Sequence, residues 1–137
     1  MAVNMQVNLG GLVMANPVTD ASGTFAAGRE YSDFVNVAGM GAVTTKGVSL
    51  NGWEGNDSPR IAETPSGMLN SIGLQNPGVD AVLSEKLPWL QEHYPELPII
   101  ANVAGFSNEE YAEVSHKISK ASNVKAIELN ISCPNVD

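Results

Sequence analysis

Polar side chains follow four predicted strands of this chain, each at the point where the strand ends. In chain order they are Ser22, Lys46, Asn102 and Asn130. Because the carboxyl ends of parallel strands meet at one edge of a sheet, where α/β proteins bind ligands, we expect these side chains to lie close together. Amide groups beside one cation suit a planar heterocycle that carries both C=O and N–H groups.

A single cysteine, Cys133, lies in the loop directly after the fourth predicted strand, at the same edge of the sheet. A lone cysteine is often a small buried hydrophobic residue. A thiol beside a cation such as Lys46 ionises more readily and then acts as a base near neutral pH. Both roles are open for Cys133 on the sequence alone.

Simpler interpretations are open for the other polar residues too. Lys46 also fits a lysine that extends from a strand end into solvent. Asn76 precedes Pro77 and is typical of a turn. Asn102 and Asn130 differ from Asn76, since asparagine is disfavoured inside strands and needs another reason to be there.

Composition excludes several classes of function. The net charge of −8, from 7 Lys and Arg against 15 Asp and Glu, argues against nucleic acid or an anionic membrane as partner. No apolar run approaches the ~20 residues of a membrane span, and no signal peptide is recognisable. One cysteine excludes an internal disulfide or a thiolate metal cluster, and His93 and His116 suggest no metal site. We therefore expect a cytoplasmic protein.

The elements that must position these residues follow from apolar periodicity. Two short runs around Gly10 and Gly11 predict a β-hairpin over residues 6–9 and 12–14. Pro88 predicts a break in one helix, and Ser107 with Glu110 forms a capping box at the start of another. Strands are predicted over residues 18–22, 42–45, 98–103 and 124–130, helices over residues 29–38, 79–94 and 107–118, and a long irregular loop over residues 46–77.

This order is typical of parallel βα units, as in an open doubly wound sheet or a (β/α)₈ barrel. Three segments of the chain, ASGTF at residues 21–25, RIAETPSGMLNSIGLQNPG at residues 60–78 and ELNISCPN at residues 128–135, closely resemble the dihydroorotate dehydrogenase family. The likeness extends from the hairpin to the last residue. With cysteine at position 133 the chain resembles class 1 of this family, because the membrane-associated class 2 enzymes carry serine at that place. The chain looks most like the catalytic subunit of the NAD-linked class 1B.

The resemblance implies a (β/α)₈ TIM barrel that binds FMN and oxidises dihydroorotate to orotate in pyrimidine (UMP) biosynthesis. It implies that Cys133 is the general base that removes the C5 proton, while a hydride passes from C6 to the flavin. Lys46 is then expected between FMN and substrate. The implied substrate-binding residues are Lys46, Asn70, Ser71, Ile72, Gly73, Leu74, Asn130 and Asn135, and the implied FMN-binding residues are Ser22, Lys46, Gly47, Asn102 and Asn130.

For class 1B the resemblance also implies a partner subunit that carries FAD and a [2Fe–2S] cluster and passes electrons to NAD. One cysteine cannot hold such a cluster, so that partner is required if NAD is the acceptor. A dimer of catalytic subunits within a heterotetramer is expected. The fumarate-linked class 1A and, more remotely, dihydropyrimidine dehydrogenase are alternatives.

A barrel of this kind needs roughly 250 residues, and the 137 residues here contain four of the eight strands. We therefore expect residues 1–137 to form a single partial domain, the N-terminal half of the barrel. Either a second chain supplies the rest or the sequence is a piece of a longer protein. A non-catalytic half-barrel that assembles with another chain is the alternative function.

Overall fold

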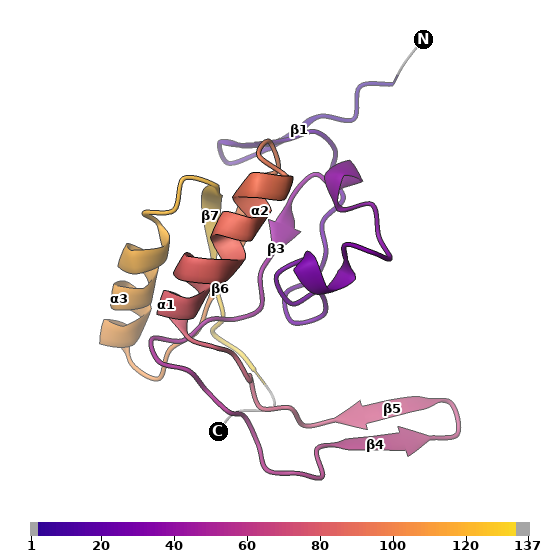
Figure 1. Cartoon of the computed structure of the whole chain (residues 1–137), viewed down its shortest axis with the longest axis vertical. Helices are drawn as coiled ribbons and strands as arrows, with labels where there is room; N and C mark the ends of the chain where they lie inside the picture. The colour runs from indigo at the N-terminus through magenta and orange to yellow at the C-terminus, as the bar shows by residue number, and fades with distance from the viewer. Residues whose placement is uncertain (1–2, 134–137) are drawn as a thin grey trace.

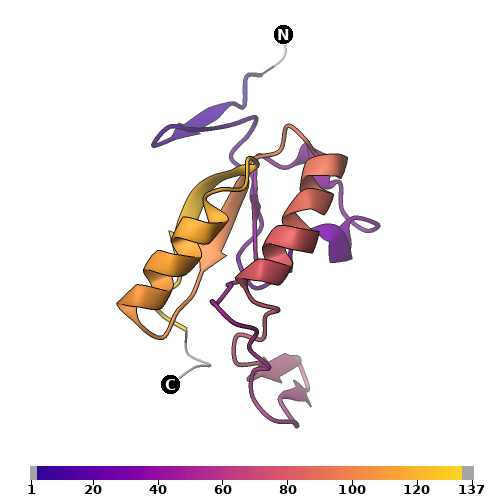
Figure 2. The same cartoon turned by 60° about the vertical axis from the view of Figure 1, so that its left-hand side comes forward.

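The computed structural model describes residues 3–133 and shows an α/β fold built on a parallel sheet (Figure 1). The sheet contains β3 (Val43–Thr44), β6 (Ile99–Val103) and β7 (Val124–Leu129), in the order β3-β6-β7. Helices cover one face of it, and two hairpins project at opposite ends of the molecule (Figure 2). Within the described residues the sheet does not close into a barrel.

The main core lies between the sheet and the helices. Because side chains alternate along a strand, Ile99, Ala101 and Val103 of β6 face the helices and are at most 1% exposed. Burial of each large aliphatic side chain there stabilises the fold by about 1.5–3 kcal/mol. Their partners include Val79, Val82, Leu87, Leu90, Val114 and Ile118.

The opposite face of the sheet carries the residues in between. Ile100 of β6 and Ala126 of β7 pack against the N-terminal hairpin, through Leu12 and Met14. Asn102 and Glu128 follow two residues later on the same two strands, and are directly paired in the β6–β7 register. The same alternation therefore places both polar side chains on the face away from the helices, beyond the hairpin.

The N-terminal hairpin is confirmed. It consists of β1 (Val7–Leu9) and β2 (Leu12–Met14), paired antiparallel around Gly10 and Gly11. Both glycines have positive φ, of 58° and 104°, which a tight two-residue hairpin turn requires and which other residues adopt at a cost.

The helix over residues 79–94 also forms, but without the break expected at Pro88. It runs as α1 (Val79–Ala81), a π-helical segment η3 (Val82–Lys86) and α2 (Leu87–His93). Pro88 has no N–H, and its ring would clash with the carbonyl of residue 84 in a regular α-helix. The wider π turn before it relieves that conflict and keeps the helix continuous.

The last helix, α3 (Asn108–Ile118), begins as predicted. The Ser107 Oγ accepts a hydrogen bond from the Glu110 N–H at 3.2 Å, and the Glu110 carboxylate accepts one from the Phe106 N–H at 2.7 Å. These bonds satisfy main-chain donors that the first helical turn leaves unpaired.

Two predictions in the first forty residues are wrong. Residues 29–38 form two short 3₁₀ turns, η1 (Arg29–Tyr31) and η2 (Val37–Gly39), instead of a helix. Tyr31 stacks on Phe25 with ring centroids 5.0 Å apart, whereas Phe34 is 84% exposed, so the apolar spacing does not form one buried face. The strand expected over residues 18–22 is reduced to one parallel bridge, between Thr19 and Ala42.

The loop expected over residues 46–77 contains a second antiparallel hairpin, made of β4 (Ile61–Thr64) and β5 (Gly67–Asn70). All eight strand residues are exposed. A strand with two exposed faces has no alternation of buried and exposed positions, so its sequence carries little period-two signal.

Candidate functional site

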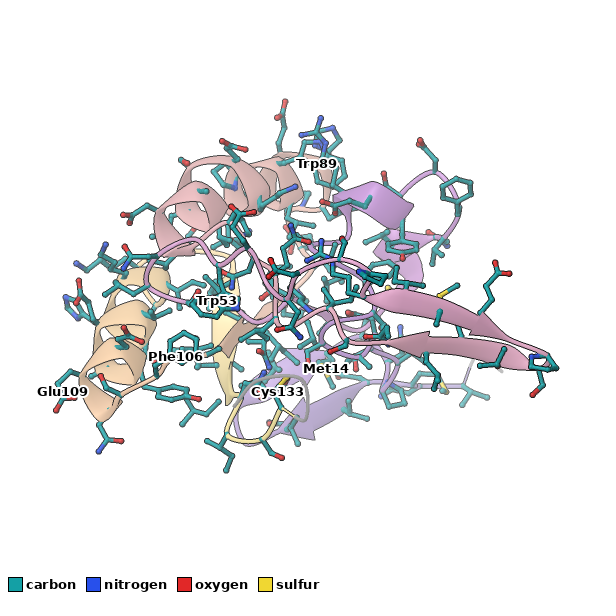
Figure 3. The ribbon with its side chains drawn as sticks, turned by 90° about the horizontal axis from the view of Figure 1, so that it is seen from below. Met14, Trp53, Trp89, Phe106, Glu109 and Cys133 are labelled. Atoms are coloured by element: carbon teal, nitrogen blue, oxygen red, sulfur yellow. The ribbon has the colours of Figure 1, made fainter. Side chains whose placement is uncertain are left out.

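A cavity of about 410 Å³ lies at the carboxyl end of the parallel sheet. We call it the strand-end cavity. Figure 3, which views the molecule from below, shows Cys133 at this end, with Phe106 and Trp53 to one side. The cavity brings together seven of the site residues expected from the sequence: Ser22, Lys46, Gly47, Leu74, Asn102, Asn130 and Cys133.

Gly47 lies where any side chain would collide with the wall of this cavity. A Cβ at this position would stand 2.7 Å from Asn102 Oδ1 and 3.0 Å from Leu74 Cδ1. The first distance is below any normal contact between such atoms. Glycine therefore lets the Asn102 and Leu74 side chains lie against the main chain at this point of the cavity wall.

Asn102 is only 2% exposed, and one of its polar atoms has no partner among residues 3–133. Its Nδ2 donates to the Glu128 carboxylate, and its main-chain N–H donates to Thr45 Oγ1 at 3.1 Å. Its Oδ1 accepts no hydrogen bond from any described residue. An unsatisfied buried acceptor costs about 1–3 kcal/mol, so this atom is placed for a donor that a ligand would supply.

Lys46 brings a positive charge to the same cavity. Its main-chain N–H donates to the Ala26 carbonyl at 2.7 Å, which fixes the backbone after β3. The Nζ approaches Gly23, where an added Cβ would lie 3.5 Å from it. Lys46 forms no ion pair with a carboxylate in residues 3–133, so its charge is available to an anionic ligand.

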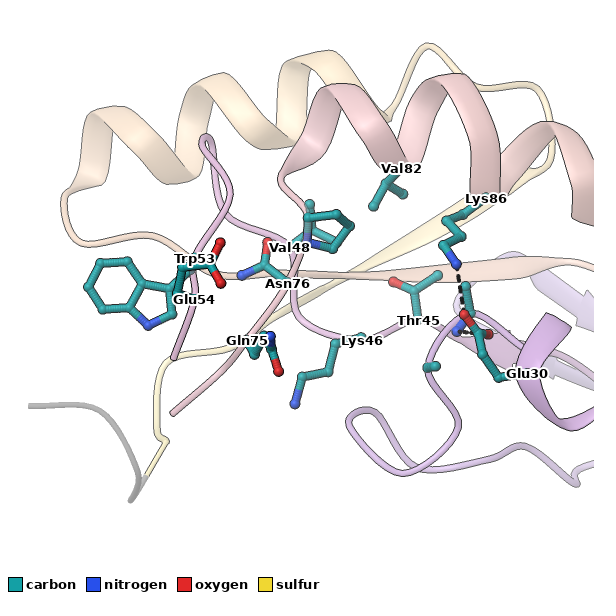
Figure 4. Close-up of a pocket in the computed structure, with 13 residues that line it drawn as sticks. Glu30, Thr45, Lys46, Val48, Trp53, Glu54, Gln75, Asn76, Val82 and Lys86 are labelled. Atoms are coloured by element: carbon teal, nitrogen blue, oxygen red, sulfur yellow. Dashed lines mark hydrogen bonds and ion pairs between the residues drawn. The ribbon is translucent and has the colours of Figure 1, made fainter. Parts of the chain in front are cut away.

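A second cavity, of about 430 Å³, also has Lys46 in its wall and lies against η3, through Val82 and Lys86. We call it the helix-side cavity. Figure 4 shows it between Trp53 at one end and the Glu30–Lys86 ion pair at the other, with the Lys46 ammonium group pointing away from the helices. The ion pair is 2.7 Å long. Burial raises the pKa of the Glu30 carboxyl, but the hydrogen bond and the charge of Lys86, together with hydrogen bonds from the main chain, outweigh it, and the pKa falls below its usual value.

Asn76 lines the helix-side cavity and, unlike Asn102, has its hydrogen bonds satisfied by its own loop. Its Oδ1 accepts from the main-chain N–H groups of Ser49 at 3.1 Å and Gly78 at 3.0 Å, and its Nδ2 donates to the Leu74 carbonyl at 2.9 Å. The expectation that Asn76 organises a turn agrees with these bonds.

The loop that carries Cys133 is held from two sides. The Asn130 N–H donates to the Val103 carbonyl at 2.8 Å, and the Tyr111 hydroxyl donates to the Asn130 carbonyl. Cys133 itself is half-buried. The sequence predicted a helix over residues 107–118, but not that Tyr111 on this helix contacts the loop through its hydroxyl group.

Two carboxyl groups near the cavity were also missed, Glu128 and Asp20. The Asp20 Oδ1 accepts a hydrogen bond from the Thr44 N–H at 2.7 Å, whereas its Oδ2 is buried with no partner among the described residues. Burial raises the pKa of the Asp20 carboxyl; the hydrogen bond from Thr44 opposes this change, and the negative charge of Glu128 adds to it. Glu128 lies between Ile127 and Leu129 in an apolar run, where charge is unexpected, and Asp20 lies within the strand predicted over residues 18–22.

The structure does not bring the segment before Leu74 to the strand-end cavity. Asn70 ends β5, and the Ser71 N–H donates to the Arg60 carbonyl at 2.8 Å. Asn56 bridges the base of this hairpin, because its Nδ2 donates to Ser71 Oγ at 3.0 Å.

Ile72 and Gly73 belong to the same base. The Ile72 carbonyl accepts a hydrogen bond from the Asn56 N–H at 3.0 Å, and Gly73 packs against Asn56 with a positive φ of 74°. Asn135, the last of the expected substrate-binding residues, lies outside the described residues.

Residues 3–133 show neither a metal centre nor a membrane-spanning helix. No group of three or more His, Cys, Asp and Glu side chains there is arranged to hold a metal ion. No helix in the same residues is both long and apolar enough to cross a membrane.

Comparison with known proteins gives consistent matches. The family model for dihydroorotate dehydrogenase matches residues 4–137. The catalytic subunit of dihydroorotate dehydrogenase B (NAD(+)) from Streptococcus pneumoniae is 62% identical over 133 residues, which are 97% of this chain and 43% of that protein. The subunit of the same name from Anoxybacillus flavithermus is 58% identical over 132 residues, which are 96% of this chain and 42% of that subunit.

A solved structure supports the fold. The crystal structure of dihydroorotate dehydrogenase from Eimeria tenella, in complex with ferulenol, matches with a TM-score of 0.75 at 21% identity. The match covers 97% of this chain and 38% of that one. The chain thus spans about two fifths of the length of the proteins that it matches.

Proposed function

This chain belongs to the dihydroorotate dehydrogenase family, and from that premise we propose that it forms part of a catalytic subunit that oxidises dihydroorotate to orotate. The observation that carries the proposal is the strand-end cavity. It combines a buried acceptor and a cation that have no partner among the described residues, a glycine with no room for a side chain, and the cysteine.

The fold fits a piece of a larger barrel. The parallel sheet has helices on one face only, and β7 is an edge strand in the described residues. Apolar residues at and after that edge are exposed, Leu129 by 55% and Ile131 by 85%. Further strands that pair with β7 would cover them. We therefore assign residues 1–137 to one partial domain, the N-terminal part of an eight-stranded barrel.

FMN fits the strand-end cavity on the chemistry of its walls. Gly47 allows close approach of a flat ring, and the buried Asn102 Oδ1 needs a donor such as the ring N–H of a flavin. Ser22 and Asn130 add polar groups on the cavity wall. When bound there, the flavin supplies the acceptor for a hydride from C6 of dihydroorotate.

The chain's own residues then handle the proton and the charges. Cys133 Sγ takes the C5 proton of dihydroorotate as general base. Lys46 holds the substrate between the flavin and the loop after β7, since its charge is not paired within residues 3–133. Residues 70–74, Asn130 and Asn135 hold the pyrimidine ring in this proposal, although Leu74 and Asn130 alone among them line the cavity in this structure.

The electron acceptor follows from the relatives. Their shared name includes NAD(+) and the words catalytic subunit. This supports a partner subunit that carries FAD and a [2Fe–2S] cluster and passes electrons to NAD, with two catalytic subunits in a heterotetramer. Fumarate as acceptor, without that partner, is the nearest alternative.

The visible absorption spectrum of the full-length protein tests the proposal. We expect a flavin band that bleaches when dihydroorotate is added without oxygen. A protein that holds flavin but is not reduced by dihydroorotate would contradict it. The same spectrum of residues 1–137 alone tests the non-catalytic alternative, since a half-barrel without its other strands should bind no flavin.

A further inference from the structure

The direction of the Asn102 amide follows from its neighbour. A carboxylate can only accept hydrogen bonds, so the Asn102 atom that contacts the Glu128 carboxylate must be the NH₂ group. The carbonyl Oδ1 therefore turns the other way. It faces Gly47, where it would be 2.7 Å from an added Cβ, and so lines the strand-end cavity.

The strand register makes this contact possible. Asn102 and Glu128 are direct partners in the parallel β6–β7 ladder, and β6 is anchored by side chains that the helices bury. A shift of one residue would turn Glu128 to the other face of the sheet. The placement of Glu128 beside Asn102 is thus set by the core and not by a local turn.

No other described group competes for this role. The Thr45 hydroxyl accepts the main-chain N–H of Asn102 and not the side-chain NH₂. The Asn130 Nδ2 also lies near Gly47, 3.4 Å from a Cβ placed there, but it forms no hydrogen bond with Asn102 Oδ1. Without Glu128, the Asn102 amide has no described partner that distinguishes its two orientations.

We propose that Glu128 is a positioning residue, which holds the Asn102 amide so that Oδ1 accepts a hydrogen bond from the ring N–H of an imide heterocycle. The inference rests on the proposed function, which brings a flavin and a pyrimidine dione to this cavity. Both rings carry such an N–H, and methylated analogues tell the two apart: 3-methyl-FMN lacks the flavin donor, and methylated orotates lack a pyrimidine donor.

The test measures ligand discrimination in the full-length protein. Dissociation constants are determined for FMN and 3-methyl-FMN with the apoprotein, and for orotate and its N-methyl derivatives with the FMN-loaded protein. In the wild type we expect methylation of one ligand class to weaken binding about tenfold, as loss of one buried hydrogen bond does. Glu128→Leu should abolish this discrimination, whereas Glu128→Gln, which retains an acceptor, should preserve it.

The control is Glu92→Leu, which removes an exposed carboxylate from α2 and should discriminate like the wild type. Glu128→Ala provides the same comparison with a smaller side chain if leucine prevents folding. Discrimination that survives in every Glu128 variant, or that is absent in the wild type, overturns the proposal. These measurements use binding alone, so a protein that fails to oxidise dihydroorotate still gives a result.

Discussion

The two cavities beside Lys46 have similar volumes, about 410 and 430 Å³, but their polar groups are used differently. In the helix-side cavity, Glu30 pairs with Lys86 and Asn76 bonds to its own loop. In the strand-end cavity, Asn102 Oδ1 has no described partner. Buried polar groups in folded proteins are nearly always bonded. Unpaired groups, more than volume, therefore identify the ligand site.

The largest expected effect is on the reaction. Cys133→Ala in the full-length, FMN-loaded protein should lower kcat by about 10²–10⁴-fold, the usual contribution of a general base. Flavin and orotate binding should be retained. Cys133→Ser should be slow at neutral pH and recover as pH rises, because a hydroxyl is the weaker acid.

Stopped-flow reduction of the flavin by dihydroorotate measures this step. Lys86→Met is the matched control, since it changes the helix-side cavity only. Near-normal turnover of Cys133→Ala would show that Cys133 is not the general base.

The next effect is on cofactor binding, and two glycines provide the comparison. Gly47→Ala places a Cβ 2.7 Å from Asn102 Oδ1. The Asn102 side chain must then move into the cavity, so FMN affinity should fall at least about tenfold. Gly52→Ala meets its nearest atom, the Pro77 carbonyl oxygen, at 3.4 Å, and should bind FMN normally. Fluorescence titration of FMN measures both, and equal affinities would argue against flavin at Gly47.

A third effect contrasts the two buried asparagines. Asn76→Ala leaves the Ser49 and Gly78 N–H groups without their acceptor and should lower the free energy of unfolding by about 2–4 kcal/mol. Asn102→Ala instead removes an acceptor that has no partner among the described residues, so it should lower the free energy of unfolding less and the flavin affinity more. Urea denaturation of the full-length protein measures the free energy of unfolding of both variants, and fluorescence titration measures their FMN affinity. If Asn76→Ala weakened FMN binding more than Asn102→Ala did, the ligand site would be the helix-side cavity instead.

The sequence predicted the strand-end cavity well because its residues follow strands, and strand ends are visible in apolar periodicity. Lys46, Asn102, Asn130 and Cys133 each come at such an end. Glu128 and Tyr111 were missed because their contacts join residues 26 and 19 positions away, at Asn102 and Asn130. Pairing of that kind depends on strand register and helix packing, which no local pattern encodes.

The errors in the fold have a related cause. Residues 29–38 have helical apolar spacing, but the Phe25–Tyr31 stack and the exposed Phe34 show that packing overrode it. The β4–β5 hairpin buries neither face, so neither periodicity applied. The N-terminal hairpin was predictable because Gly10 and Gly11 specify its turn locally.

The smallest expected effect concerns pH, and the carboxyl group of Asp20, near the strand-end cavity, and that of Glu30, in the helix-side cavity, should respond with opposite signs. Burial raises the pKa of Asp20 in the folded protein, so folding favours its protonated form, and its contribution to stability is lost as pH rises through the raised pKa. Asp20→Asn should therefore stabilise the protein at pH 7. The Lys86 hydrogen bond lowers the pKa of Glu30 against the effect of burial. The contribution of ionised Glu30 to the stability of the fold is therefore present at pH 7, and is lost as pH falls through the lowered pKa.

Glu30→Gln should accordingly destabilise at pH 7 by no more than about 1 kcal/mol, as for an exposed ion pair, and by less in acid or at high salt. Urea denaturation of both variants between pH 3 and pH 7 would compare them. Because each substitution is isosteric, a difference in sign between them reports the electrostatic environment of each carboxyl group and not lost packing. Equal signs at pH 7 would mean that Asp20 and Glu30 share one electrostatic environment, contrary to the contrast between their hydrogen bonds.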